Sequence, residues 1–251
     1  MEGSHYRYGG RSFVRVTEVL KVLNKPAMVG WAAKTAGRLV LDDPATYNTP
    51  EKAAQGIYDT RNKAAGIGSV AHRFAENVSK GTPIDLEALP EELRGYGVAF
   101  QGFMRMCAPK PLFVEASLYS ETHGYAGTTD LIATLADGLV YDIDFKTARG
   151  VYDENKLQLA AYRGAEIIVP SLPDVPCPRC DATGKINDGR CGQCAGGGFI
   201  FDPVPMPGID KAAVVLLGAD GRWSIAEVDT PLEPFLHLLE VWRWLNNGGP
   251  R

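Results

Sequence analysis

Two short motifs place acidic and basic side chains where they could act together on a phosphate group. The first is Gly127-Thr-Thr-Asp130, and the second is Asp142-Ile-Asp144-Phe-Lys146. Residues 140–146 alternate polar with apolar types, which predicts a strand with Asp142, Asp144 and Lys146 on one face. A divalent cation held by such carboxylates keeps water positions open for a substrate phosphate. The motifs therefore predict a Mg²⁺ or Mn²⁺ site.

A hairpin is expected to bring the two motifs together. Asp137-Gly138 is a turn signal between two strand-like runs. If residues 136–138 form a three-residue loop, Asp130 lies directly opposite Asp144 on the neighbouring strand. Facing carboxylates repel unless a cation lies between them. An alternative stays open here, because a half-exposed hairpin could carry the same charges as an ordinary solvated face.

Two helix-like segments flank these strands and carry further polar residues. Residues 154–168 follow the charged strand and place Gln158 and Tyr162 one turn apart on the same helical face. A segment before the strands, from residue 68 to 76, contains His72. A single histidine on a helix is most often a surface or core residue. The interest of His72 therefore depends on the motifs that accompany it.

Taken in chain order, these residues resemble a known family. His72, Gly127-x-x-Asp130, Asp144-x-Lys146 and Gln158-x-x-x-Tyr162 are similar to the motifs of the PD-(D/E)XK nuclease superfamily, in its RecB-like exonuclease branch, which includes the CRISPR adaptation nucleases. The resemblance covers roughly residues 64–170. Residues 16–31 also look like the leader region of RecB-like nucleases encoded by bacteriophages.

The resemblance implies four metal ligands, namely Asp130, Asp144, the backbone carbonyl of Phe145 and the side chain of His72. Asp142 is an additional acid at a position where the family usually has an apolar residue. Asp144 is the favoured ligand of the two, because its spacing to Lys146 fits the motif. Glu115, in a strand expected over residues 112–119, could also approach the metal, but an ordinary outward-facing strand residue is the favoured interpretation.

The same resemblance implies the reaction. Lys146 would orient or deprotonate the attacking water and stabilise charge on the phosphate, while Gln158 and Tyr162 would line the site and position the scissile strand. The implied activity is that of a divalent-metal-dependent DNA exonuclease, which hydrolyses phosphodiester bonds at DNA ends in phage recombination, replication or repair. DNA would be the partner, together with a recombination or replication protein.

Two alternatives to the exonuclease remain. A structure-specific DNA endonuclease of the same superfamily would share the motifs, because only the surrounding walls select ends over internal bonds. A catalytically silent nucleic-acid-binding or assembly protein could use the same scaffold. The intact set of two aspartates and Lys146 counts against the silent protein.

Four cysteines form a second group with chemical meaning. Cys177-Pro-Arg-Cys180 and Cys191-Gly-Gln-Cys194 are separated by ten residues, which is typical of a tetrahedral Zn²⁺ site and is similar to the repeats of DnaJ-type chaperones. Some RecB-like relatives instead bind an iron–sulfur cluster, through cysteines that are split between distant parts of the chain. The compact arrangement here favours structural zinc, and disulfides are a further alternative.

Composition sets the remaining limits. The chain has 251 residues with 45% hydrophobic content and a net charge of −4, which suits one sizeable core. No run of about eighteen apolar residues and no signal peptide is evident, so we expect a cytoplasmic protein that does not enter a membrane, in a bacterial host if the phage resemblance holds.

A negative net charge does not exclude DNA binding, because phosphate contacts need only a local basic rim. Candidates for that rim are Arg61, Lys63 and Arg73.

The expected fold class is α/β, with a restriction-endonuclease-like core in which helices flank a central mixed sheet. A single domain over residues 1–251 would combine a mostly helical N-terminal part (12–106), a catalytic core (111–170 and 208–247) and a zinc-binding insertion (174–202). Besides 112–119, strands are expected at 126–135, 139–147, 212–217 and 223–228. The final helix, 232–246, would bury Phe235, Leu239, Trp242 and Leu245.

Overall fold

The computed structural model describes residues 5–79, 83–170, 175–176, 183, 185–187, 189–190, 199–200 and 203–246. Its main strands are β1 (His5–Tyr8), β2 (Arg11–Arg15), β3 (Lys110–Ser120), β4 (Tyr125–Thr134), β5 (Val140–Lys146), β6 (Ile167–Val169), β11 (Val204–Pro205), β12 (Lys211–Leu217) and β13 (Trp223–Glu227). The helices are α1 (Val16–Val19), the 3₁₀ turn η2 (Leu20–Val22), α2 (Pro26–Asp42), α3 (Pro50–Ser79), α4 (Glu91–Cys107), α5 (Asp153–Arg163) and α6 (Glu233–Asn246).

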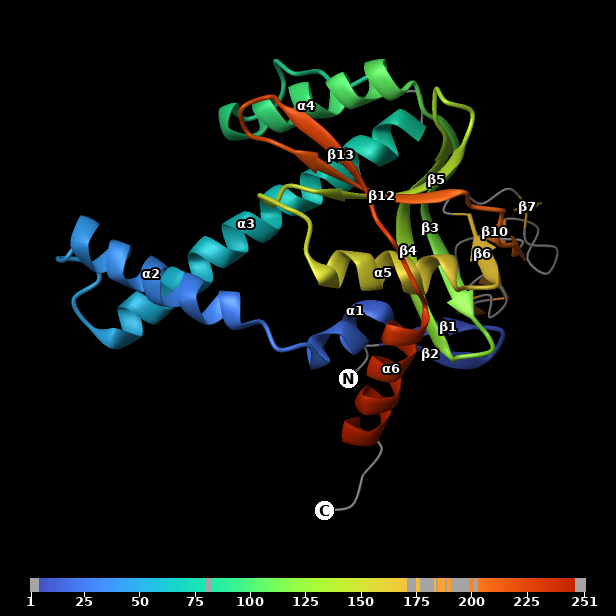
Figure 1. The fold of residues 1–251 in the computed structure, drawn as a ribbon, viewed down its shortest axis with the longest axis horizontal. Helices are drawn as coiled ribbons and strands as arrows, with labels where there is room; N and C mark the ends of the chain where they lie inside the picture. Colours follow the sequence, from blue (N-terminus) through green and yellow to red (C-terminus); the bar gives the residue numbers. More distant parts are fainter. Residues whose placement is uncertain are drawn as a thin grey trace.

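A mixed, mostly antiparallel sheet forms the centre of the molecule, and helices flank it (Figure 1). The strand order is β11-β6-β3-β4-β5-β12-β13, with β2 paired to β4 and β1 to β2. The β5–β12 and β2–β4 pairs are parallel, and the other pairs in this sheet are antiparallel. The predicted α/β class, with a mixed sheet flanked by helices, is therefore confirmed.

The hairpin between β4 and β5 has the predicted register. Leu131 pairs with Ile143 and Ala133 pairs with Tyr141, which requires the three-residue loop over residues 136–138. Gly138 has a φ of 83° in this loop, a backbone conformation that a side chain would strain. The turn signal and the alternating pattern predicted this pairing on the condition of a three-residue loop, and the structure has that loop.

The two faces of β5 meet different neighbours. Tyr141, Ile143 and Phe145 belong to the largest apolar cluster, which includes Phe100 and Phe103 of α4 and residues of α3. On the other face Asp142 and Asp144 lie beside Ala212 and Val214 of β12 in parallel register, and these two β12 residues pack against Leu159 of α5. Helix α5 therefore covers the acidic face of the strand.

Two features of the fold differ from expectation. Residues 5–15 form the β1–β2 hairpin, so residues 12–15 of the part that was expected to be mostly helical (12–106) belong to a strand. The buried stripe of α6 is confirmed for Phe235 and Leu239, but it is wrong for Leu245, which is 58% exposed. In Figure 1 the C-terminal end of α6 extends beyond the sheet.

The segment expected to bind zinc is described only in part. Two short strand pairs are present, β7 (Val175–Pro176) with β10 (Phe199–Ile200), and β8 (Lys185–Ile186) with β9 (Gly189–Arg190). All four cysteines of the predicted zinc site, Cys177, Cys180, Cys191 and Cys194, lie outside the described residues. Among the helices that the structure describes, none has the length and apolar content needed to cross a membrane.

Candidate metal centre

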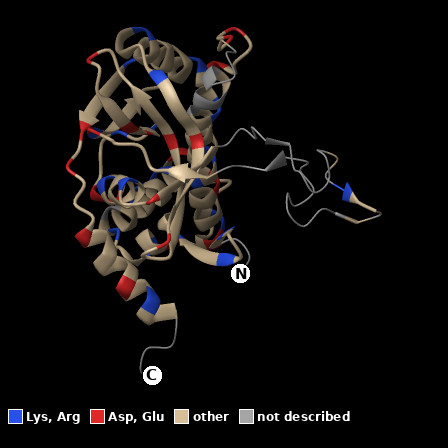
Figure 2. Ribbon diagram, turned by 90° about the vertical axis from the view of Figure 1, so that its right-hand side faces the viewer, with Lys and Arg blue, Asp and Glu red and all other residues tan. Residues whose placement is uncertain are grey.

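Three carboxylates lie at one level across the centre of the sheet. The β3–β4 pairs on either side of Glu115 place it across from Asp130. The β4–β5 pairs end one position before Asp130 and Asp144, which are the next residues opposite each other. Glu115, Asp130 and Asp144 therefore form a row on three adjacent strands, and acidic residues are visible on the strands in Figure 2. Such a row is unfavourable unless cations compensate it.

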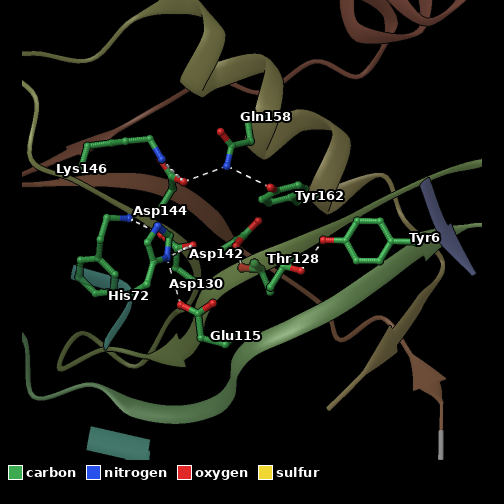
Figure 3. Close-up of polar contacts among 12 residues, drawn as sticks. Tyr6, His72, Glu115, Thr128, Asp130, Asp142, Asp144, Lys146, Gln158 and Tyr162 are labelled. Atoms are coloured by element: carbon green, nitrogen blue, oxygen red, sulfur yellow. Dashed lines mark hydrogen bonds and ion pairs between the residues drawn. The ribbon is translucent and has the colours of Figure 1, made fainter. Parts of the chain in front are cut away.

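His72 of α3 lies at one end of this row (Figure 3). Its Nδ1 atom is 3.1 Å from Glu115 Oε1 and 3.1 Å from Asp130 Oδ1. The nitrogen and the two carboxylate oxygens all lie within 4.8 Å of one another. Metal–ligand bonds to such atoms are about 2.0–2.2 Å long, so one cation can contact all three after small side-chain shifts. The group can therefore bind a metal ion.

The charge of His72 follows from the same contacts with Asp130 and Glu115. Hydrogen bonds to Asp130 and Glu115 outweigh the effect of burial and raise the pKa of His72 to about 10. The imidazole is then doubly protonated at neutral pH, and its Nδ1–H donates to both carboxylates. A histidine must be neutral to bind a metal. A bound cation would therefore take the place of the proton between these groups.

Glu115 departs from the predicted role of an outward-facing strand residue. Its φ is 49°, which is left-handed and uncommon for a residue with a side chain. The β3–β4 register also shifts by one residue just before it, between Pro111 and Phe113. The carboxylate contacts His72 and belongs to the group that can bind a metal ion, so the favoured interpretation was wrong. The left-handed backbone and the register shift depend on tertiary contacts, so the pattern of residues along the strand does not predict them.

The opposite end of the row carries a chain of hydrogen bonds to α5. Lys146 Nζ lies 2.6 Å from Asp144 Oδ1, and Gln158 Nε2 donates to the same oxygen at 3.0 Å. Gln158 also donates to the hydroxyl of Tyr162 at 3.0 Å. The structure thus brings together Asp130, Asp144, Lys146, Gln158, Tyr162 and His72, as the sequence predicted.

Burial and charge act against each other at Asp144 and Lys146. Asp144 is 1% exposed, and this burial raises its pKa although the adjacent Lys146 ammonium opposes the shift. Burial disfavours the charged form of Lys146, but Asp144 and Asp130 outweigh it and its pKa is raised. Lys146 is consequently an ammonium at neutral pH. It can therefore neutralise negative charge beside Asp144.

Asp142 lies on the same face of β5 as Asp144, two residues earlier, and has different neighbours. It is 0% exposed, and its Oδ1 accepts a hydrogen bond from Thr129 Oγ1 at 2.6 Å. Burial raises its pKa to about 7, against the effect of the Thr129 hydrogen bond. The Oδ2 atoms of Asp142 and Asp144 have no hydrogen-bond partner in the described part of the chain. The interpretation of this strand face as an ordinary solvated surface is therefore wrong.

Phe145 supports the site through its backbone. Its N–H donates to Asp130 Oδ2 at 2.8 Å, while its ring is part of the apolar core. Asp130 is thus fixed by one oxygen to β5 and directs the other toward His72. The ligand role of the Phe145 carbonyl stays a prediction.

A cavity of about 330 Å³ opens over these groups. It is lined by Tyr6, Arg15, Val16, Thr17, His72, Glu115, Ala126, Gly127, Thr128, Asp130, Lys146, Gln158 and Tyr162. At Gly127 a Cβ atom would lie only 2.4 Å from the Tyr162 ring, so glycine permits the close approach of α5. A larger depression of about 770 Å³ is lined by residues that include Thr147, Leu217 and Trp223. None of the carboxylates in the row lines it.

The basic residues expected to contact DNA lie outside this cavity. Arg61, Lys63 and Arg73 are exposed on α3, and none of the three lines the cavity. Their role in binding DNA stays a prediction. In contrast, Tyr6 and Arg15 were not predicted and do line it. They come from β1 and β2, whose pairing with the sheet joins residues more than one hundred positions apart.

No protein-family model matches the chain, and no curated protein matches it. The assignment of a function therefore rests on the chemistry of the site.

Proposed function

We propose that this protein is a divalent-metal-dependent DNA exonuclease of the PD-(D/E)XK superfamily, in its RecB-like branch, that processes DNA ends in phage recombination, replication or repair. The row of Glu115, Asp130 and Asp144 across three adjacent strands carries the proposal. His72 lies at one end of the row and Lys146 at the other, and both line the same cavity. The sheet, with helices on both sides, is compatible with a restriction-endonuclease-like fold.

The donor set fits a hard or borderline divalent cation. Two carboxylate oxygens and one imidazole nitrogen converge in the His72–Glu115–Asp130 group, and Asp144 keeps a buried oxygen without a partner among the described residues. Oxygen-rich sites suit Mg²⁺ and Mn²⁺, and the imidazole favours Mn²⁺ of these two. When bound, the cation would lower the pKa of a water and neutralise charge on the phosphate.

The protein side chains support hydrolysis in distinct ways. Because Lys146 is cationic, its proposed role is to stabilise negative charge that develops on the phosphoryl oxygens rather than to deprotonate water. The Tyr162 hydroxyl accepts a hydrogen bond from Gln158, so its own proton is free to donate to a phosphate oxygen. Gln158 joins both groups to Asp144 and fixes their relative positions.

Digestion of end-labelled linear DNA tests the proposal. We expect cleavage in Mn²⁺, no cleavage in EDTA, and loss of at least about a thousandfold in rate for Asp130→Ala, Asp144→Ala and Lys146→Ala. Thermal unfolding checks that each variant stays folded. Digestion by these variants at the parental rate would refute the site, and binding of DNA without cleavage in Mn²⁺ would favour the silent alternative.

The same assay separates the exonuclease from the endonuclease. Circular single-stranded DNA has no end, so the proposed exonuclease leaves it intact in Mn²⁺ while it digests the linear form of the same sequence. Cutting of the circle at a comparable rate would identify the structure-specific endonuclease instead.

We also propose a structural Zn²⁺ bound by Cys177, Cys180, Cys191 and Cys194, on the basis of their spacing. Elemental analysis of the purified protein is expected to find one zinc per chain. The Cys177→Ser, Cys180→Ser double variant should lose it. Iron and acid-labile sulfide in place of zinc would identify a cluster.

A further inference from the structure

Arg15 contributes a cationic side chain to the lining of the cavity. It is the last residue of β2, and its side chain lines the cavity together with His72, Glu115 and Asp130. Its Nε atom is buried and has no hydrogen-bond partner among the residues that the structure describes. Within the described ranges, the guanidinium forms no ion pair with the nearby carboxylates.

The guanidinium is nevertheless held in place. Its central carbon lies 5.0 Å from the centre of the Tyr6 ring, a cation–π contact. The Tyr6 hydroxyl lies 2.8 Å from Thr128 Oγ1, on the strand that also carries Asp130 (Figure 3). The backbone of Arg15 is fixed as well, because it pairs with Ala126 of β4. Both the side-chain contact with Tyr6 and the pairing of its strand therefore position Arg15 relative to the His72–Glu115–Asp130 group.

The distribution of charge in the cavity indicates what Arg15 binds. Glu115 and Asp130 contact His72, and Lys146 contacts Asp144. Arg15 lines the same cavity, and its Nε is a buried donor with no partner in the described part of the chain, which is unfavourable. A phosphate supplies several acceptor oxygens, and a guanidinium binds them through two parallel hydrogen bonds. An anion that enters with the substrate would satisfy this side chain.

We propose that Arg15 binds a phosphate of the substrate strand, adjacent to the scissile phosphate. The proposal rests on the DNA exonuclease function, since the metal group and Lys146 are assigned to the scissile phosphate. Arg15 would then fix the register of the strand in the cavity. Its loss weakens binding of the substrate more than it slows the chemical step.

Three variants test this role. Arg15→Gln removes the charge, and Arg15→Lys keeps the charge without the two-pronged geometry. Arg7→Gln is the matched control, because Arg7 is exposed on the neighbouring strand β1. With end-labelled DNA in Mn²⁺, we expect Arg15→Gln to raise KM by about tenfold to a hundredfold with a smaller change in kcat. Arg15→Lys should lie between, and Arg7→Gln should match the parent.

A chemical change in the substrate makes the test sharper. A methylphosphonate at the phosphate next to the scissile one removes its charge. The parental KM should rise as it does in Arg15→Gln, and the variant should show no further increase. An unchanged KM in Arg15→Gln, or an equal methylphosphonate penalty in the parent and in Arg15→Gln, would overturn the proposal. Unfolding temperatures of all variants are compared first, because Arg15 lies between the buried residues Val14 and Val16.

Failure of the exonuclease function itself would be distinguishable. If the parent cleaves no DNA in Mn²⁺, the anion site is tested with inorganic phosphate and pyrophosphate by thermal shift. A rise in unfolding temperature for the parent and Arg7→Gln, and none for Arg15→Gln, supports an anion site at Arg15. An equal rise in all three proteins, or no rise in the parent, overturns it.

Discussion

The two faces of β5 are equally buried and opposite in chemistry. On one face Phe145 and Ile143 are 1% and 0% exposed within the apolar core. On the other face Asp144 and Asp142 are just as buried under α5. Burial of aromatic and aliphatic side chains stabilises the fold, whereas burial of carboxylates costs free energy unless they are paired. Because side chains alternate with a period of two along a strand, β5 has one face that stabilises the fold and one face that does not.

The described side chains compensate the acidic face only in part. Lys146 and Gln158 contact one oxygen of Asp144, and Thr129 contacts one oxygen of Asp142. The second oxygen of each aspartate has no hydrogen-bond partner in the described part of the chain. Apolar residues at the same positions would make a more stable sheet, so the acidic side chains are not explained by stability.

The largest effect on stability is expected from the apolar face. Phe145→Ala removes a ring that packs against Phe100 and Phe103 and should lower the free energy of unfolding by about 3–5 kcal/mol. Urea unfolding measures this change. Tyr58→Ala is the control, because Tyr58 is exposed on α3, and it should cost less than about 1 kcal/mol. Equal losses in the two variants would contradict the assignment of this face to stability.

The acidic face, unlike the apolar face, should make the stability of the fold depend on pH. The pKa of Asp142 rises from an ordinary value of 3.8 to about 7 in the folded protein, so the folded state binds an additional proton between these values. The resulting stability is present in acid and is lost as the pH rises through about 7. In EDTA, Asp142→Asn should remove this decrease, which amounts to a few kcal/mol.

Unfolding curves at several pH values measure the effect of Asp142. Asp59→Asn, which changes an exposed aspartate of α3, serves as the control and should keep the parental pH dependence. If Asp142→Asn and the parent lose stability in parallel between pH 4 and 7, Asp142 is not the group responsible.

The close approach of α5 to the acidic face predicts an intermediate effect. Gly127→Ala would bring a methyl group to 2.4 Å from the Tyr162 ring. We expect a loss of about 1–3 kcal/mol in stability, together with reduced cleavage because Tyr162 and Gln158 move. In a Tyr162→Ala background the same substitution should cost little. A full penalty in that background would show that the contact with Tyr162 is not the cause.

Glu115 gives the smallest change in free energy among these predictions. Glu115→Gln keeps the shape of the side chain but removes a charged ligand from the metal group. The Mn²⁺ concentration that gives half-maximal cleavage should rise by at least about tenfold, since even outer partners of metal ligands contribute that much. Glu121→Gln, an exposed carboxylate just after β3, is the control. An unchanged Mn²⁺ requirement would exclude Glu115 from the site.

Local patterns were enough to predict the central part of the fold. Alternation in residues 140–146 and the Asp137-Gly138 turn predicted the β4–β5 register on the condition of a three-residue loop, and with it the opposition of Asp130 and Asp144. The helical spacing of Gln158 and Tyr162 placed both side chains over the same face. These features depend on residues that are close in sequence, so the period of the side chains determines them.

The missed parts of the site all depend on distant contacts. Arg15 reaches the cavity because β2 pairs in parallel with β4, and a parallel pair has no turn signal. Glu115 joins the metal group through a left-handed backbone next to His72. The motif resemblance indicated which residues matter at the centre of the site, but tertiary pairing decides which others surround it.

Mn²⁺ binding is the most direct test of the metal centre. Electron paramagnetic resonance can follow a Mn²⁺ titration and detect a coordinated histidine nitrogen. The parent should bind Mn²⁺ with one such nitrogen, and His72→Ala should lose both the nitrogen signal and most of the affinity. Asp130→Asn should also bind weakly. Mn²⁺ binding of equal strength in the parent and both variants, or no binding by the parent, would contradict the metal centre proposed for this protein.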